Sequence, residues 1–139
     1  MNQYGLHSPF LFEFYKACFG PAFKHSFPSI SKLRSKLKRD KTEIQITDFG
    51  AGSLVYKSNN RRVSEMHASA SISKKQGEFL HRLVCYFKPK TILELGTHLG
   101  LSSAYMALAS ETEIVTLEGC PSTAEVASQN HRELDVENV

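Results

Sequence analysis

Two glutamates and two glycines between residues 94 and 118 form the pattern with the clearest chemical meaning in this chain. Glu94 lies within a short apolar run, and Gly96 and Gly100 follow it directly. Glycine at such positions permits positive φ angles and close approach of a ligand to the backbone. Glu118 ends a second apolar run, where a carboxylate roughly 20 residues past a glycine turn can accept hydrogen bonds from ribose hydroxyls. The pattern predicts a turn that binds a nucleoside.

The elements that must position these residues follow from the apolar pattern. Apolar runs at residues 91–95 and 114–117 predict two parallel strands, each covered on both faces. Residues 101–108 predict a helix that packs back on the first strand, so the order strand, turn, helix, strand is a βαβ unit of an α/β fold. A helix over residues 74–87 is predicted before this unit, and a helix that starts at Pro121 is predicted after it.

The glycine spacing argues against a phosphate ligand. A dinucleotide fingerprint, G-x-G-x-x-G, needs a middle glycine that the turn from Gly96 to Gly100 lacks. A P-loop needs a lysine followed by serine or threonine, where this chain has Leu101 and Ser102. The carboxylate of Glu94 would repel a pyrophosphate but can pair with an ammonium group. S-adenosylmethionine fits this pattern, because it has ribose hydroxyls and an amino group but no phosphate.

Two motifs in this segment resemble class I S-adenosylmethionine-dependent methyltransferases. They are residues 93–102, Leu-Glu-Leu-Gly-Thr-His-Leu-Gly-Leu-Ser, and residues 116–121, Thr-Leu-Glu-Gly-Cys-Pro. The likeness is greatest to small-molecule O-methyltransferases of the catechol and caffeoyl-CoA type, whose first helix is similar to the one that Ser73 caps here. The resemblance covers about residues 71–139. It implies an incomplete Rossmann-like fold, with the first two core strands and their flanking helices.

The resemblance also implies which residues would bind the methionine end of the cofactor. Glu94 would hold the amino group beside the backbone of Gly96. His98 and Ser102 would line the methionine tail and its carboxylate. Ile72 would offer backbone groups to the same carboxylate.

The remaining site positions belong to the turn and to the nucleoside end. Thr97 and Gly100 complete the turn. By the same resemblance, Glu118 would accept both ribose hydroxyls, and Gly119 would pass close to the adenosine. These residues and those at the methionine end are our predicted cofactor site.

Residues 1–70 predict a helical N-terminal extension with a hairpin or loop, ahead of a cofactor-binding segment at residues 71–139. An aromatic helix starts at Ser8-Pro9 and ends before Gly20. We expect local helices, this one included, to cover the faces of the strands. A short strand at residues 42–49 leads into the glycine-rich turn at 48–53, which lacks the helix and the acidic strand end of a nucleotide site.

A basic helix is predicted within the extension, at residues 29–41. Ile30, Leu33 and Leu37 form a narrow apolar stripe along it. Its lysines and arginines favour a solvated face, and nucleic-acid binding is the alternative. No aromatic residue is interleaved with these charges, which weakens that alternative.

Composition excludes several classes of protein. The net charge of +3 is too small to indicate nucleic acid, and no apolar run approaches the ~20 residues of a membrane span. The three cysteines form no C-x-x-C pair, which favours reduced thiols in a cytoplasmic protein. The histidines show no metal-ligand spacing. In the family that the chain resembles, the metal-binding acids and the catalytic base lie beyond the matching segment, so a longer enzyme could use a divalent metal.

Three hypotheses of function remain open at this point. The first is transfer of a methyl group to an oxygen or nitrogen of a small-molecule acceptor. The second is a Rossmann-like binding or assembly module without chemistry, and the third is nucleic-acid binding through the basic helix. Two core strands leave an open apolar edge. We therefore expect the N-terminal part of a longer enzyme, inactive by itself, or a chain that pairs with another copy.

Overall fold

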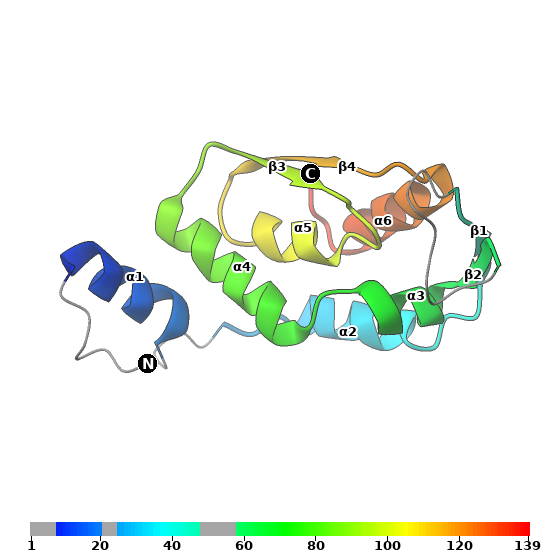
Figure 1. Cartoon of the computed structure of the whole chain (residues 1–139), viewed down its shortest axis with the longest axis horizontal. Helices are drawn as coiled ribbons and strands as arrows, with labels where there is room; N and C mark the ends of the chain where they lie inside the picture. Colours follow the sequence, from blue (N-terminus) through cyan, green and yellow to red (C-terminus); the bar gives the residue numbers. More distant parts are fainter. Residues whose placement is uncertain (1–7, 21–24, 48–57) are drawn as a thin grey trace.

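A computed structural model describes residues 8–20, 25–47 and 58–139. The two parallel strands form one layer, helices lie beneath them, and further helices form the opposite side of the molecule (Figure 1). In chain order the elements are α1 (Pro9–Phe19), α2 (Pro28–Leu37), β1 (Glu43–Gln45), β2 (Asn60–Arg62), α3 (Val63–Ala70), α4 (Lys74–Phe87), β3 (Thr91–Leu95), α5 (Leu101–Ala107), β4 (Glu113–Leu117) and α6 (Pro121–Glu133).

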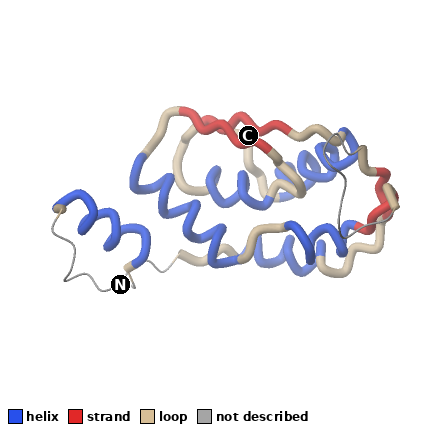
Figure 2. The backbone as a smooth tube through the Cα atoms, viewed as in Figure 1, coloured by secondary structure: helices blue, strands red, loops and turns tan. Residues whose placement is uncertain are grey.

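The βαβ unit predicted from the sequence is confirmed. Strands β3 and β4 pair in parallel, with Thr91 opposite Glu113 and Leu95 opposite Leu117, and α5 connects them (Figure 2). The preceding helix begins where predicted, because the hydroxyl of Ser73 accepts a hydrogen bond from the backbone of Gln76 in a capping box. Pro121 is the first residue of α6.

A single buried cluster joins the basic helix α2 to the βαβ unit. Ile30, Leu33 and Leu37 on α2 are fully buried and belong to the same cluster as Leu99 and Tyr105. The predicted apolar stripe is therefore confirmed. Because this core draws on both halves of the chain, it fixes the extension against the glycine turn. The domain boundary at residue 70 remains a prediction.

The charged side chains of α2 do not all face solvent. Lys32 is exposed, and Lys36 forms a salt bridge with Glu133 of α6. Arg34 instead is half-buried, and its Nη1 donates a hydrogen bond to the carbonyl of Ile72 at 2.8 Å. The expected solvated face thus holds for Lys32, Lys36, Lys38 and Arg39, which are exposed, but not for Arg34.

The hairpin strands of the extension are short. Strand β1 pairs with β2 in antiparallel register, with Ile44 opposite Arg61, so the strand expected at residues 42–49 is found only in the first half of that range. The polar stretch that follows forms the short helix α3. The glycine-rich turn at residues 48–53 lies outside the described residues.

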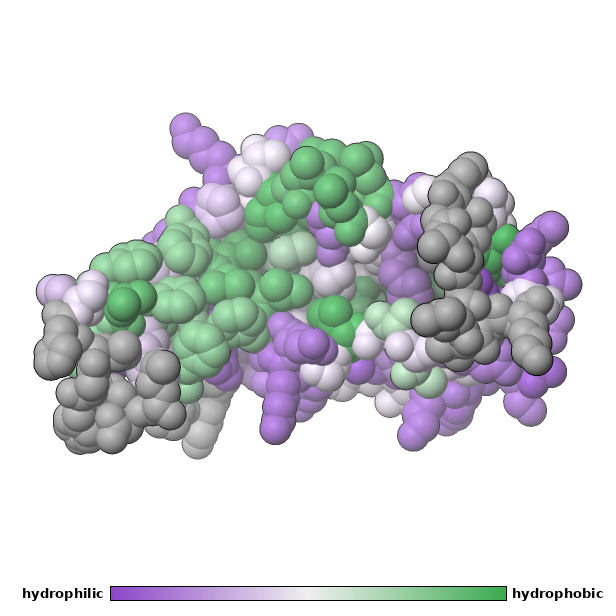
Figure 3. Space-filling model, in the orientation of Figure 1, coloured by the Kyte–Doolittle hydropathy of each residue, from purple (hydrophilic) through white to green (hydrophobic). Residues whose placement is uncertain are grey.

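The expectation that both strands are covered on both faces is wrong. Ile114, on the face toward the helices, is buried, but the opposite face is bare. Its four apolar side chains are exposed to 63% (Leu93), 76% (Leu95), 41% (Val115) and 54% (Leu117). Figure 3 shows apolar surface gathered over β3 and β4. We call these four residues the bare sheet face.

The aromatic helix α1 does not cover this face either. It packs on α4, where Phe14 contacts the rings of Tyr86 and Phe87 at centroid distances of 5.6 and 5.9 Å. Figure 1 shows α1 at one end of the molecule, beyond α4. The sequence did not predict that α1 packs on α4, because Tyr86 and Phe87 are compatible with either orientation of α4. The bare sheet face therefore has no covering element among the described residues.

Candidate functional site

The glycine turn after β3 is held against the end of β4. Gly96, His98 and Gly100 have φ angles of 94°, 51° and 74°, so the backbone enters the left-handed region three times in five residues. The backbone N–H groups of Gly96 and Thr97 both donate to the carbonyl of Leu117, at 2.8 and 3.2 Å. The turn therefore lies at the carboxyl ends of both strands, where ligands bind in open α/β sheets.

The carboxylate of Glu118 lies directly beside this turn. One oxygen accepts the backbone N–H of His98 at 2.8 Å, and the other accepts the backbone N–H of Cys120 at 3.0 Å. These two bonds fix the side chain and leave acceptor capacity on both oxygens, because an ionised carboxylate has about four acceptor sites. The structure thus brings together the turn and the acid that the sequence singled out.

Glu94 is held by a chain of hydroxyl groups. The hydroxyl of Thr116 donates to the carboxylate of Glu94 at 2.6 Å, and the hydroxyl of Thr97 lies 2.7 Å from that of Thr116. Since the proton of Thr116 goes to Glu94, Thr97 is the donor to Thr116. Sequence analysis missed Thr116, because only the strand register shows that it stands opposite Glu94.

Gly96 and Gly100 play different roles in the turn. A Cβ atom added to Gly96 would have no protein atom within 4 Å, so the space beside Gly96 is open. A Cβ atom added to Gly100 would lie 2.6 Å from Nε2 of His131. Gly100 therefore allows packing within the protein, whereas Gly96 borders a space that a ligand can occupy.

His131 of α6 is a second residue that sequence analysis missed. It is buried, and its Nε2 lies 3.1 Å from the carbonyl of Gly100 and 2.9 Å from the hydroxyl of Ser103. Because a carbonyl can only accept, Nε2 carries the proton. Burial lowers the pKa of His131, although the carbonyl of Gly100 and the charge of Glu94 act in the opposite direction. His131 therefore braces the turn as a neutral side chain.

Burial of histidines predicts how stability depends on pH. Burial lowers the pKa values of His67, His81, His98 and His131 below the ordinary 6.5. The unfolded chain then binds more protons than the folded chain once the pH falls below about 6.5, so stability is full above that pH and decreases below it. We expect urea denaturation to give a lower free energy of unfolding at pH 5.5 than at pH 7.5. Equal or greater stability at pH 5.5 would contradict this account.

The other predicted site residues are placed less directly. Ser102 is half-buried in the first turn of α5, and Gly119 is exposed beside Glu118. Ile72 lies in the α3–α4 connection, its side chain packs on the core that contains Leu99, and its carbonyl is bound by Arg34. The structure thus positions Ile72 through the extension rather than through the turn.

A hollow near the site runs along the outer edge of β4. It has a volume of about 530 Å³, with Thr97 and Glu118 among its lining residues and α6 as its wall. At the far end of this edge, the backbone N–H of Ile114 donates to the carbonyl of Asn138 at 2.8 Å. We interpret the hollow as an open strand edge next to the site.

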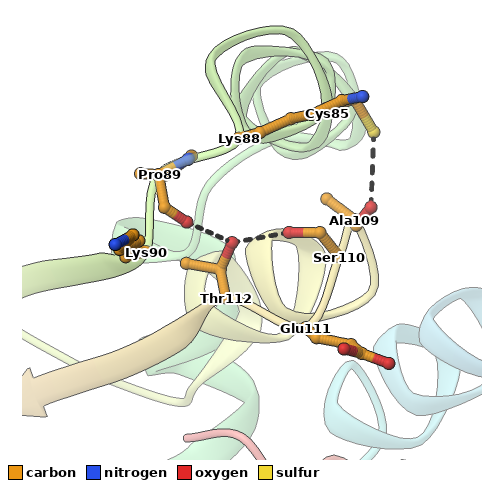
Figure 4. Close-up of a pocket in the computed structure, with 8 residues that line it drawn as sticks. All are labelled: Cys85, Lys88, Pro89, Lys90, Ala109, Ser110, Glu111 and Thr112. Atoms are coloured by element: carbon orange, nitrogen blue, oxygen red, sulfur yellow. Dashed lines mark hydrogen bonds between the residues drawn. The ribbon is translucent and has the colours of Figure 1, made fainter.

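A separate cavity of about 390 Å³ lies at the amino ends of the two strands (Figure 4). Thr112 donates to the carbonyl of Pro89 at 2.8 Å, and Cys85 lies 3.6 Å from the carbonyl of Ala109. Ligands of open α/β sheets bind at the carboxyl ends instead. This cavity is therefore not part of the candidate site.

Within residues 8–20, 25–47 and 58–139, no group of three or more histidine, cysteine, aspartate or glutamate side chains is placed to hold a metal ion. No helix in these ranges is long and apolar enough to cross a membrane.

Comparisons with known proteins agree with the fold. An O-methyltransferase from Bacillus cereus, solved in complex with SAH (S-adenosylhomocysteine), superimposes with a TM-score of 0.57 at 18% identity, over 91% of this chain and 45% of that one. A Klebsiella pneumoniae protein assigned as an O-methyltransferase gives 0.55 at 22% identity, over 89% and 44%. The expected Rossmann-like methyltransferase fold is thereby confirmed, and this chain spans less than half of either structure.

Sequence comparison identifies the family. A catechol O-methyltransferase from Niastella koreensis is 44% identical over 62 residues, which are 43% of this chain and 28% of that protein. The family model described as O-methyltransferase matches residues 52–138, well over half of the chain and including both motifs of the candidate site. The chain therefore belongs to the O-methyltransferase family.

Proposed function

We propose that this chain is the cofactor-binding part of an S-adenosylmethionine-dependent methyltransferase that acts on a small-molecule acceptor. The observation that carries the proposal is the pairing of Glu118 with the glycine turn, beside the open space at Gly96. The residues fit this cofactor, because the carboxylates of Glu118 and Glu94 suit hydroxyl and ammonium groups and not a pyrophosphate.

Each residue of the site would bind one part of the cofactor. Glu118 would accept the ribose hydroxyls with the acceptor capacity that His98 and Cys120 leave free. Glu94, oriented by Thr116, would pair with the amino group. Because their own hydrogen bonds already fix both carboxylates, little side-chain entropy would be lost on binding.

S-adenosylmethionine supplies a methyl carbon that is already electrophilic, so the protein's main task is positioning. Holding donor and acceptor in line at near-attack distance makes the reaction effectively unimolecular. The rigid turn, braced by His131 and bound to β4, would serve this purpose for the donor. The base that takes the acceptor's proton and the acceptor pocket would lie outside this chain.

The acceptor is proposed from the family alone. Membership of the O-methyltransferase family favours an oxygen nucleophile over nitrogen, and the Niastella koreensis relative is named for catechol. We propose a small hydroxylated acceptor, with catechol as the first compound to test in a longer form of the enzyme.

Glu118→Ala is the experiment that tests this function. We expect it to weaken binding of S-adenosylmethionine by about 1.5–3 kcal/mol, or roughly 10- to 150-fold, because hydrogen bonds to a charged group have this strength. Calorimetric titration of the wild-type and variant chains measures the difference. Glu113→Ala is the matched control, since Glu113 is an exposed acid at the opposite end of β4. Unchanged affinity in Glu118→Ala would remove Glu118 from the site.

A further inference from the structure

The buried thiol of Cys120 joins the N-terminal extension to the connection that follows Glu118. Its sulfur accepts the backbone N–H of Thr47 at 3.3 Å, and it donates to the carbonyl of Gln45 at 3.8 Å. Cys120 is only 4% exposed and belongs to the same core cluster as Ile46, which stands between these two residues. Figure 1 shows β1 beside the start of α6. The extension therefore fixes the side chain of Cys120.

The backbone of Cys120 in turn holds the carboxylate of Glu118. Its N–H donates to one carboxylate oxygen at 3.0 Å, while the other oxygen accepts the N–H of His98 in the glycine turn at 2.8 Å. Gly119, between the two residues, is exposed and has no side chain that could anchor the connection. One of the two bonds that orient Glu118 therefore depends on the position of the Cys120 backbone.

Two anchors from different parts of the chain fix that backbone. The carbonyl of Cys120 accepts the N–H of Ala124 in the first turn of α6 at 2.9 Å, and its thiol is bound to the chain at the end of β1. The anchor in α6 lies within residues 52–138, which the family model matches, whereas Gln45 and Thr47 precede that segment. The thiol contact thus connects the candidate site to residues outside the matched segment.

We propose that Cys120 is a positioning residue, whose thiol, held by the extension, fixes the Glu118 carboxylate in the orientation that accepts the ribose hydroxyls. This inference rests on the proposed function. A carboxylate that is oriented before the ligand arrives loses little side-chain entropy on binding, so a loosened one binds hydroxyl groups less well. The extension would then contribute to recognition of the ribose through Cys120.

The first test compares S-adenosylhomocysteine with its 2′-deoxy and 3′-deoxy forms, each of which lacks one ribose hydroxyl. Cys120→Ala removes both bonds of the thiol and keeps the backbone N–H. We expect this variant to reduce the wild-type preference for S-adenosylhomocysteine over the deoxy forms by roughly 3- to 10-fold in calorimetric titrations. Cys120→Ser, which keeps a donor and an acceptor at the same position, should restore most of the preference.

A double-mutant cycle tests whether Cys120 acts through Glu118. In the Glu118→Ala background, Cys120→Ala should cause no further loss of affinity for S-adenosylhomocysteine. Thr47→Pro breaks the same contact from the other side, because proline has no N–H to donate to the sulfur, and we expect it to reduce the preference as Cys120→Ala does. Cys18→Ala is the matched control, since it removes an equally buried thiol from α1 and should leave the preference unchanged.

A purely structural role for Cys120 would give a different result. Loss of core packing would lower the melting temperature and weaken all three ligands equally, and an unchanged ratio of affinities would overturn the inference alone. Additive losses in the double-mutant cycle would also overturn it, because Cys120 would then act independently of Glu118. If the wild-type chain shows no preference for the ligand with both hydroxyls, or binds none of the three, the proposed function itself fails.

Discussion

Gly96→Val is expected to abolish binding of S-adenosylmethionine while the chain still folds. The added side chain would project into space that holds no protein atom within 4 Å, so it would collide with the ligand and not with the protein. The φ angle of 94° adds backbone strain of roughly 1–2 kcal/mol, which a folded domain can bear. Calorimetric titration measures the binding, and circular dichroism checks the fold.

Gly100→Ala is the control for this experiment. Its φ angle is also positive, but its new Cβ atom would lie 2.6 Å from Nε2 of His131. We expect a lower melting temperature together with near-normal affinity in the folded fraction. If Gly96→Val binds the cofactor as the wild type does, the ligand does not lie against this turn.

The bare sheet face is expected to make the 139-residue chain self-associate and to leave it without methyl-transfer activity. Four large apolar side chains are exposed together there, and each forfeits part of the roughly 1.5–3 kcal/mol that full burial of such a side chain provides. Contiguous apolar patches of this kind mark surfaces that another chain or segment covers. Light scattering and sedimentation velocity measure the association, and transfer of labelled methyl to catechol measures activity.

A double substitution separates the bare sheet face from other apolar surface. Leu93→Lys with Val115→Glu places opposite charges on neighbouring strands, because these residues are register partners. We expect this variant to be monomeric. Leu108→Lys, which removes an exposed leucine at the end of α5, should leave association unchanged. A wild-type chain that is a stable, active monomer would mean that no further strands are needed.

The local structure could be predicted from the sequence because it depends on neighbouring residues. Ser8 and Ser73 cap the helices they were expected to cap, and Pro121 begins α6 as its fixed φ angle favours. Gly96 and Glu118 were identified because a glycine turn and an acidic strand end are defined by spacing along the chain. The hydrogen bond between Glu118 and the backbone of His98 in the glycine turn follows from the parallel pairing of two adjacent strands.

The long-range features could not be predicted, because they depend on which elements meet. The sequence shows that Leu93 and Leu95 are apolar, but it does not show that α1 packs on α4 and leaves them bare. Thr116 and His131 became part of the site only through strand register and the packing of α6. Arg34 belonged to a run of basic residues, and its inward orientation is visible only where it binds Ile72.

The most direct test of the central claim is a pair of calorimetric titrations of this chain, with S-adenosylhomocysteine and with NAD⁺. Both ligands offer an adenosine ribose to Glu118, but only NAD⁺ brings a pyrophosphate to a turn that lacks the middle glycine and has Glu94 close by. We predict that S-adenosylhomocysteine binds with one site per chain and that NAD⁺ does not bind at the same concentrations. Tighter binding of NAD⁺, or no binding of S-adenosylhomocysteine by the folded chain, would contradict the assignment of this turn to S-adenosylmethionine.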